Sequence, residues 1–237
     1  KLRVAILLFV VIFMVAVVIV AVLMVRSSGK ANTEQAERKD TVLFGVKSIM
    51  VEGSSHYTDE QIVKVSEIYI GQSLFFVNKR RGAENILRKF PYVEKVTINN
   101  PSFNQIKIAV KEAKPVGIVK HKNNWLIIGE NGKGLEELPE GSSRLKDYRI
   151  LKCKINKNGG LGCMTFSSRS IDIINSITTV LDKSNLKDVT VIDITDYTNI
   201  LLSWNNSIIF KMGNDIILDK KLSYAAKTLD RVLKSHG

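Results

Sequence analysis

An unbroken apolar run near the start of the chain constrains its fold more than any other feature. Leu2 to Val25 is a stretch of 24 residues in which Arg3 is the only polar side chain. As a helix it would be about 36 Å long, enough to cross a hydrocarbon core of about 30 Å. A cleaved signal peptide would have an apolar core of about 7 to 15 residues followed by a small-x-small cleavage motif. Since no such motif occurs between Ala21 and Ser28, we predict an uncleaved transmembrane anchor over residues 1–25.

The residues that flank this anchor leave its orientation open. Lys1 and Arg3 lie at its start, and Arg26 and Lys30 follow it, so the positive-inside count is a draw. The first residue is not Met, which suggests that cytoplasmic charges precede it. Residues 26–41 are polar apart from two alanines. We predict that they form a linker or a polar extension of the anchor helix.

The charge balance does not indicate a nucleic-acid-binding protein. The chain has 35 Lys and Arg against 23 Asp and Glu, a formal net charge of +12. Four of the cations flank the apolar run, and the densest cluster elsewhere is Lys79-Arg80-Arg81. A nucleic-acid interface would gather its cations on one element and place aromatic side chains among them. We therefore expect no nucleic-acid partner.

Residues 42–113 show the pattern of a small α+β domain. Residues 42–51 read as a strand, and Thr58-Asp59-Glu60-Gln61 has the form of a capping box that opens a short helix. A second helix has its apolar stripe at i, i+3, i+4 and i+7 from Ala83 and ends at Pro91. Strands follow at 93–98 and 105–112. The order strand, helix, helix, strand, strand predicts one sheet covered by two helices.

Residues 114–237 show a second pattern, which predicts a mixed β-sheet domain with flanking helices. Short strands are expected at 116–119, 125–128 and 148–155, and at 189–194, 200–204 and 208–212, the last two joined as a hairpin at Asn205-Asn206. A helix over 171–181 has Ser170 as its expected N-cap. An amphipathic helix that includes Leu222 and Leu229 ends the chain.

Four segments, in order, resemble the POTRA domain of the bacterial FtsQ/DivIB cell-division family. They are Val51–Gly53, Gly71–Asn78, Phe90–Val96 and Val110–Val116. Trp125–Leu135 is similar to the segment that follows the POTRA domain in that family. The resemblance covers nearly the whole chain, and it implies a POTRA domain over 42–113 and a β domain over 114–237.

The residue pattern contains no catalytic or metal-binding constellation. The three histidines stand alone, and we interpret each as a surface residue; Glu52, Glu112 and Asp193 are isolated carboxylates that we interpret as solvated or turn-forming. The two cysteines lack the paired spacing of a zinc site. A disulfide between them stays an open alternative, but we favour the interpretation in which they are not bridged. The Gly129–Gly134 segment is a turn rather than a phosphate loop. We expect no enzyme, no cofactor and no metal. The histidines and cysteines in question are His56, His121, His236, Cys153 and Cys163.

A binding module remains, and exposed strand edges are its natural sites. An unpaired strand can accept a partner segment through backbone hydrogen bonds. The hypothesis places partner binding at Ile208 and Phe210 on the strand before the last helix, and at Tyr224, Lys227 and Arg231 on that helix. The alternative, that Tyr224 packs into the domain, stays open at this point.

The family resemblance implies a function and a location. It implies a divisome scaffold with one span in the cell membrane, a cytoplasmic N-terminus and extracytoplasmic domains at the division septum. Its partners would be bitopic proteins of the FtsL and FtsB/DivIC type, through which it would help control the septal peptidoglycan synthase complex. The family continues with a further strand where this sequence ends at Gly237, so the sequence is truncated or this member lacks the strand. Two alternatives are a POTRA protein of envelope translocation or assembly and a membrane-anchored cell-wall enzyme.

Overall fold

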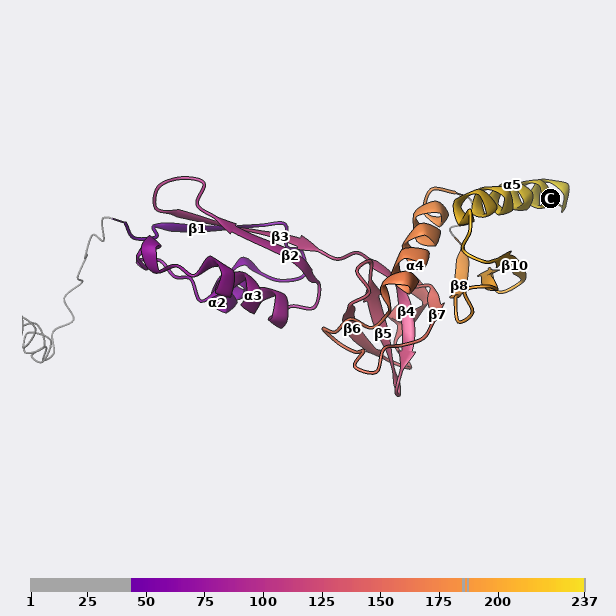
Figure 1. Ribbon diagram of the computed structural model, residues 1–237, viewed down its shortest axis with the longest axis horizontal. Coiled ribbons are helices and arrows are strands. Elements are labelled where there is room, and N and C mark those ends of the chain that lie inside the picture. The colour runs from indigo at the N-terminus through magenta and orange to yellow at the C-terminus, as the bar shows by residue number, and fades with distance from the viewer. Residues whose placement is uncertain (1–43, 185, 187, 237) are drawn as a thin grey trace, which may run out of the picture. The chain divides into compact units, whose positions relative to one another are not determined.

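The computed structural model describes residues 44–184, 186 and 188–236 (Figure 1). The predicted anchor at 1–25 and the predicted linker at 26–41 lie outside the described residues. Within the described part of the chain, no helix combines the length and the apolar character needed to cross a membrane.

The first sheet has three strands in the order β1-β3-β2. Strand β1 (Ser48–Glu52) runs parallel to β3 (Gln105–Glu112), and β2 (Val93–Asn99) runs antiparallel to β3. The helices α2 (Asp59–Ser66) and α3 (Lys79–Lys89) lie along one side of these strands, with the short 3-10 helix η1 (Leu74–Phe76) between them in sequence (Figure 1). The predicted order of strand, helix, helix, strand, strand is confirmed.

Local chemistry explains where the first helices begin and end. The Thr58 hydroxyl accepts from the Gln61 backbone N–H, and the Gln61 side chain accepts from the Thr58 N–H, so the predicted capping box is present. Asn78 caps α3 in the same manner through the Arg81 N–H. Ile62 and Ile86, one from each helix, are fully buried and pack in the same core cluster as Ile106 of β3.

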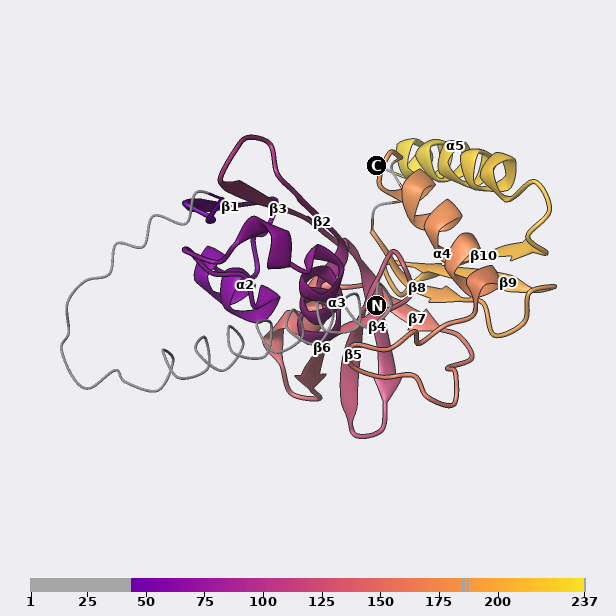
Figure 2. The ribbon, with the colours of Figure 1, turned by 60° about the vertical axis from the view of Figure 1, so that its left-hand side comes forward.

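The second sheet has seven strands in the order β10-β9-β8-β7-β4-β5-β6. Its parallel pairs are β4 with β7 and β7 with β8, and its other pairs are antiparallel. The helices α4 (Ser168–Leu181) and α5 (Leu218–His236) contact each other, and their buried side chains share one core cluster with strands of this sheet (Figure 2). The strands are β4 (Pro115–His121), β5 (Asn124–Gly129), β6 (Gly134–Pro139), β7 (Ile150–Lys152), β8 (Val189–Asp193), β9 (Ile200–Trp204) and β10 (Ile208–Gly213).

Most of the expected elements of this sheet are confirmed, and two expectations are corrected. Strand β6 was not expected; the segment Gly129–Gly134 is the turn that joins it to β5. The N-cap of α4 is Ser167, whose hydroxyl accepts from the Ser170 N–H, because Ser170 is itself buried and lies 2.8 Å from the Tyr197 hydroxyl. The predicted hairpin between β9 and β10 is present, with the turn at Asn205-Asn206 in the left-handed region.

Candidate partner-binding surfaces and a polar network

The predicted site residues of the last helix lie on its exposed side. Tyr224 is 69% exposed, and Lys227 and Arg231 are exposed as well. Leu222 and Leu229 are buried in the domain core, so the opposite side of α5 packs against the sheet. The alternative in which Tyr224 packs into the domain is therefore wrong. Its role in binding stays a prediction.

Strand β10 forms one edge of the seven-stranded sheet, as the hypothesis of partner capture requires. The side chains of Ile208 and Phe210 are partly buried and pack against the domain core. The side chain of Ile209 points the other way and is 63% exposed. The strand thus offers its backbone edge and Ile209, rather than Ile208 and Phe210, to an incoming segment.

Sequence reasoning overlooked Ile209, although its signal was present. Side chains alternate between the two faces of a strand, so a strand that buries positions 208, 210 and 212 must expose position 209. Ile216 and Ile217, just before α5, are also exposed apolar residues. We use the name C-terminal surface for the free edge of β10 and the exposed side chains of Ile209, Ile216, Ile217, Tyr224, Lys227 and Arg231.

The C-terminal surface is basic. Helix α5 carries five cationic and two acidic side chains, and Lys211 is exposed on β10. Coulomb attraction at such a surface favours a partner segment with acidic side chains, mainly by speeding association. The cationic residues of α5 are Lys220, Lys221, Lys227, Arg231 and Lys234, and its acidic residues are Asp219 and Asp230.

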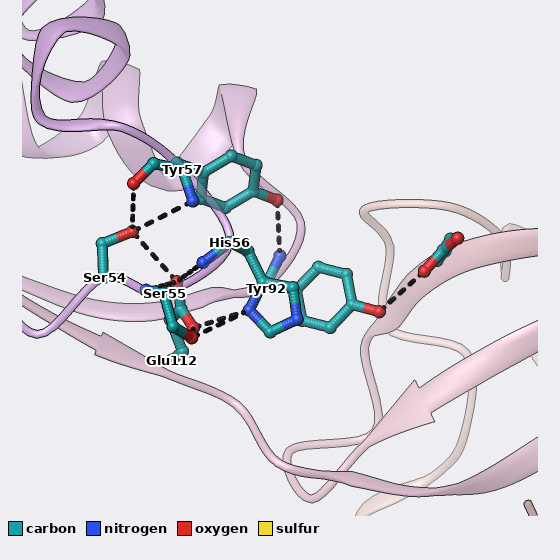
Figure 3. A network of polar contacts seen from close by, with 7 residues as sticks. Ser54, Ser55, His56, Tyr57, Tyr92 and Glu112 are labelled. Atoms are coloured by element: carbon teal, nitrogen blue, oxygen red, sulfur yellow. Dashed lines mark hydrogen bonds and ion pairs between the residues drawn. The ribbon is translucent and has the colours of Figure 1, made fainter. Parts of the chain in front are cut away.

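A second polar site, not predicted from the sequence, surrounds the carboxylate of Glu112 at the end of β3 (Figure 3). The carboxylate accepts from Ser54 Oγ at 3.0 Å, from Ser55 N and Oγ at 2.9 and 2.6 Å, and from His56 N at 3.0 Å. His56 Nδ1 lies 2.7 Å from it. We call Glu112 with Ser54, Ser55 and His56 the Glu112 cage.

The cage strongly favours the ionised carboxylate. Burial acts to raise the pKa of Glu112, but the hydrogen bonds from Ser55 and His56 outweigh it and lower the pKa to about 2. Because an ionised carboxylate only accepts, His56 Nδ1 must carry the proton in this contact. His56 is exposed, as interpreted, but it does not stand alone, and Glu112 is the turn-forming rather than the solvated carboxylate of the two alternatives.

A chain of contacts links the cage to the second sheet. The His56 ring stacks on the Tyr92 ring at 3.8 Å between centroids (Figure 3). The Tyr92 hydroxyl donates to Glu136 of β6 at 2.9 Å, and Glu136 also accepts two hydrogen bonds from Arg144. Burial, followed by the hydrogen bond to Glu136, raises the pKa of the Tyr92 hydroxyl. The cage is thus one end of a network that joins the two sheets.

The serine, histidine and glutamate of the cage do not have the geometry of a catalytic triad. In a triad, one imidazole nitrogen faces the carboxylate and the other faces the serine. Here Ser55 Oγ lies 3.3 Å from His56 Nδ1, the same nitrogen that faces Glu112. Both cage serines donate to the carboxylate instead. The arrangement stabilises an anion and does not activate a nucleophile.

The pairing of parallel strands explains why the cage forms. Glu52, at the end of β1, lies opposite Ala109 of β3, so the turn after β1 meets the last residues of β3. Gly53 enters this turn with φ of +84°. The sequence signal was the polar run 54–56 after one strand together with a carboxylate at the end of another. This signal can be interpreted only if β1 is known to run parallel to β3.

Among the described residues, the cysteines form no disulfide and no group of side chains is placed to bind a metal. Cys153 and Cys163 are not bonded to each other, and burial raises the pKa of the Cys153 thiol. Within residues 44–184, 186 and 188–236, no group of three or more His, Cys, Asp or Glu side chains is placed to hold a metal ion. His121 is partly buried, with Nδ1 3.7 Å from Glu137.

Comparison with known proteins identifies the family. The sequence profile of the "POTRA domain, FtsQ-type" matches residues 44–113. The "Cell division protein DivIB" of Clostridium botulinum (strain Hall) is 30% identical over 194 residues, which cover 79% of this chain and 73% of that protein. The "Cell division protein DivIB" of Clostridium acetobutylicum is 29% identical over 178 residues, with 75% and 70% covered.

A solved structure also shows some likeness, although it carries no weight in the assignment. It is the major extracytoplasmic domain, in its trans isomer, of the cell-division protein DivIB from Geobacillus stearothermophilus. It matches with 17% identity and a TM-score of 0.29, over 51% of this chain and 97% of that one. The sequence relatives and the matched profile carry the conclusion: the chain belongs to the FtsQ/DivIB family of bacterial cell-division proteins.

Proposed function

We propose that the protein is a membrane-anchored scaffold of the divisome that binds other membrane-bound division proteins. Residues 1–25 anchor it in the cell membrane with the N-terminus in the cytoplasm, and a POTRA domain (42–113) and a β domain (114–237) lie outside the cytoplasm. At the septum it binds bitopic partners of the FtsL and FtsB/DivIC type. Through them it helps control septal peptidoglycan synthesis without catalysing a reaction itself.

The observation that carries the proposal is the free edge of β10, the strand that the basic helix α5 follows in the chain. Backbone N–H and C=O groups along an edge strand can pair with an extended segment of a partner. Ile209 supplies exposed apolar area on the sheet face turned away from the core, and Tyr224 supplies it on α5. The partner segment that fits is extended, apolar in part and acidic.

A common membrane would strengthen such binding. Partners that are anchored in the same bilayer meet at a higher effective concentration than partners in free solution. A modest interface at the C-terminal surface is then sufficient for assembly. This positional mechanism also explains why a scaffold needs no catalytic group.

Two measurements test the proposal. A fluorescent fusion of the full chain is imaged in dividing cells, where we expect enrichment at midcell; an even distribution around the envelope would refute the divisome role. A photo-crosslinking amino acid at position 209 should capture an FtsB/DivIC-type protein. The matched control is position 50 on β1, where Met50 is an exposed side chain at the edge of the other sheet.

A comparison of capture at the two positions shows which sheet edge binds the partner. Capture at position 209 and none at position 50 supports the C-terminal surface. Capture at position 50 alone would transfer the binding site to the POTRA sheet. Turnover of lipid II or peptidoglycan by the purified protein would contradict the scaffold role.

A further inference from the structure

Four phenylalanine side chains are exposed at one end of the three-stranded sheet. Phe75, Phe76 and Phe103 are 77%, 82% and 67% exposed, and Phe44 is also exposed. The ring of Phe44 lies 5.3 Å from that of Phe75 and 5.5 Å from that of Phe103, both edge to face. Grouped exposed apolar side chains mark an interaction surface more often than scattered ones do. We call these four residues the Phe44 cluster.

Backbone contacts hold three distant segments together at this cluster. Leu74 N donates to Phe44 O at 2.9 Å, and Lys47 N donates to Asn104 O, next to Phe103, at 2.7 Å. Because Leu74 packs against the core, η1 directs Phe75 and Phe76 outward. The start of β1 and the turn between β2 and β3 lie at the same end of the sheet (Figure 1). The fold therefore presents these rings in a defined arrangement.

Two lysines follow the rings closely in sequence. Lys47 follows Phe44 by three residues, and Lys79 begins α3 three residues after Phe76. Neither lysine forms an ion pair with a residue that the structure describes. Aromatic rings next to lysines are typical of surfaces that lie at the bilayer interface, where the rings sit at headgroup level and the cations meet anionic lipid.

The position of the cluster in the sequence favours the membrane over other occupants. Phe44 comes 19 residues after Val25, the last residue of the predicted anchor. Even fully extended, 19 residues span at most about 65 Å. If residues 1–25 cross the bilayer, the cluster stays within that distance of the membrane, which raises its effective concentration at the lipid surface.

We propose that the Phe44 cluster docks the POTRA domain onto the anionic lipid surface of the membrane that holds the anchor. This inference rests on the proposed anchor. Phe75, Phe76 and Phe103 enter the interface, and Lys47 and Lys79 lie near lipid phosphates. Docking restricts the orientations of the domain at the membrane.

Depth-dependent fluorescence quenching tests this proposal on the full chain. The protein is incorporated into vesicles of phosphatidylcholine and phosphatidylglycerol, with or without brominated acyl chains that quench nearby Trp. Phe76→Trp is the reporter, and Lys89→Trp, at the exposed far end of α3, is the matched control. We expect brominated lipid to remove most of the emission that F76W adds to that of Trp125 and Trp204, and to leave the emission added by K89W unchanged.

A second set of variants shows whether the cluster itself causes the quenching. Adding Phe75→Ser and Phe103→Ser to F76W should restore its emission, with an unchanged far-UV circular dichroism spectrum as the sign of folding. Phe103→Trp serves as an independent reporter if F76W does not fold. Equal quenching at positions 76 and 89, or none at 76 and 103, overturns the docking. The cluster would then be a binding surface for a protein partner.

Flotation of the same samples separates the docking from the anchor. A chain that floats with the vesicles but shows no quenching at position 76 refutes the docking alone. A chain that does not float refutes the anchor on which the proposed function depends, and the docking with it.

Discussion

The Glu112 cage and the C-terminal surface both lie at the ends or edges of strands, yet they differ in how fully their polar groups are used. In the cage, one carboxylate accepts from three neighbouring residues and is largely shielded from solvent. Along β10, the backbone edge has no neighbouring strand within the described sheet. A saturated polar cluster holds parts of a fold together, whereas an open edge can still accept a partner.

Mutations at the two sites should therefore have different effects. Changes in the cage should alter the free energy of unfolding, because its donors lose their acceptor inside the fold. Changes on the C-terminal surface should alter partner affinity and leave folding nearly unchanged, because solvated side chains contribute little to stability.

The largest effect is expected for Gly53→Ala in the turn of the cage. An added Cβ would lie 2.1 Å from Val110 O, and the φ of +84° is strained for any L side chain. We expect a loss of more than about 3 kcal/mol in unfolding free energy. Gly71→Ala is the matched control, since its φ is +90° and nothing lies within 4 Å of the added Cβ; it should cost about 1–2 kcal/mol. Urea unfolding of the full chain in detergent measures both, and equal losses would show that the close contact has no effect.

Removal of the carboxylate by Glu112→Ala should have the next largest effect. Several donors of the turn would lose a charged acceptor, so we expect a loss of about 3 kcal/mol in unfolding free energy. Glu84→Ala is the control, because Glu84 forms an exposed ion pair with Arg80 on α3, and it should cost less than about 0.5 kcal/mol. A similar small loss in both variants would mean that the cage is not structural.

Acid should weaken the same site. Since the pKa of Glu112 is lowered to about 2 from an ordinary value of 4.5, its stabilisation is complete above pH 4.5 and is lost as the pH falls through about 2. We expect the ionised carboxylate to contribute about 1–2 kcal/mol to the unfolding free energy, a value that already includes the reduction by solvent screening of its exposed part. Unfolding free energies measured from pH 6 to pH 2 should fall less steeply for Glu112→Gln than for the natural chain. Parallel curves would contradict the assignment.

The smallest effect on folding is expected at the open surface. Tyr224→Ala should weaken binding of an FtsB/DivIC-type partner about tenfold, equivalent to about 1.4 kcal/mol, because it removes an exposed aromatic anchor. Its unfolding free energy should change by less than about 0.5 kcal/mol. Tyr69→Ala, which removes a similarly exposed tyrosine from the first domain, is the control and should bind normally. Equal binding by both variants would remove Tyr224 from the interface.

Sequence reasoning was most successful where the signal is local. The capping box at Thr58, the apolar stripe through Ile86 and the turn at Asn205-Asn206 are each specified by neighbouring residues, and each is present in the structure. The N-cap of α4 was misplaced because Ser167 and Ser170 are both suitable caps by residue type. In the structure the helix begins at Ser168, so Ser167 is the cap, and Ser170 lies in the first turn, where it is buried.

The candidate sites were less predictable because they depend on which strands are neighbours. Alternation along 208–212 could have identified Ile209 as exposed once Met212 was assigned to the core. The Glu112 cage could not be found in that way. Glu112 is 56 to 58 residues from Ser54, Ser55 and His56 in sequence, and they meet because β1 runs parallel to β3.

By itself, the sequence determined the apolar run at 2–25, the α+β order of the elements and the family, because these depend on local residue patterns. Only the tertiary structure decided which edge of the second sheet is open, which side of α5 carries Tyr224, and that His56 and Glu112 form a pair. The physical reason is that exposure and ion pairing depend on contacts between distant segments. Local periodicity contains no information on which strands lie side by side.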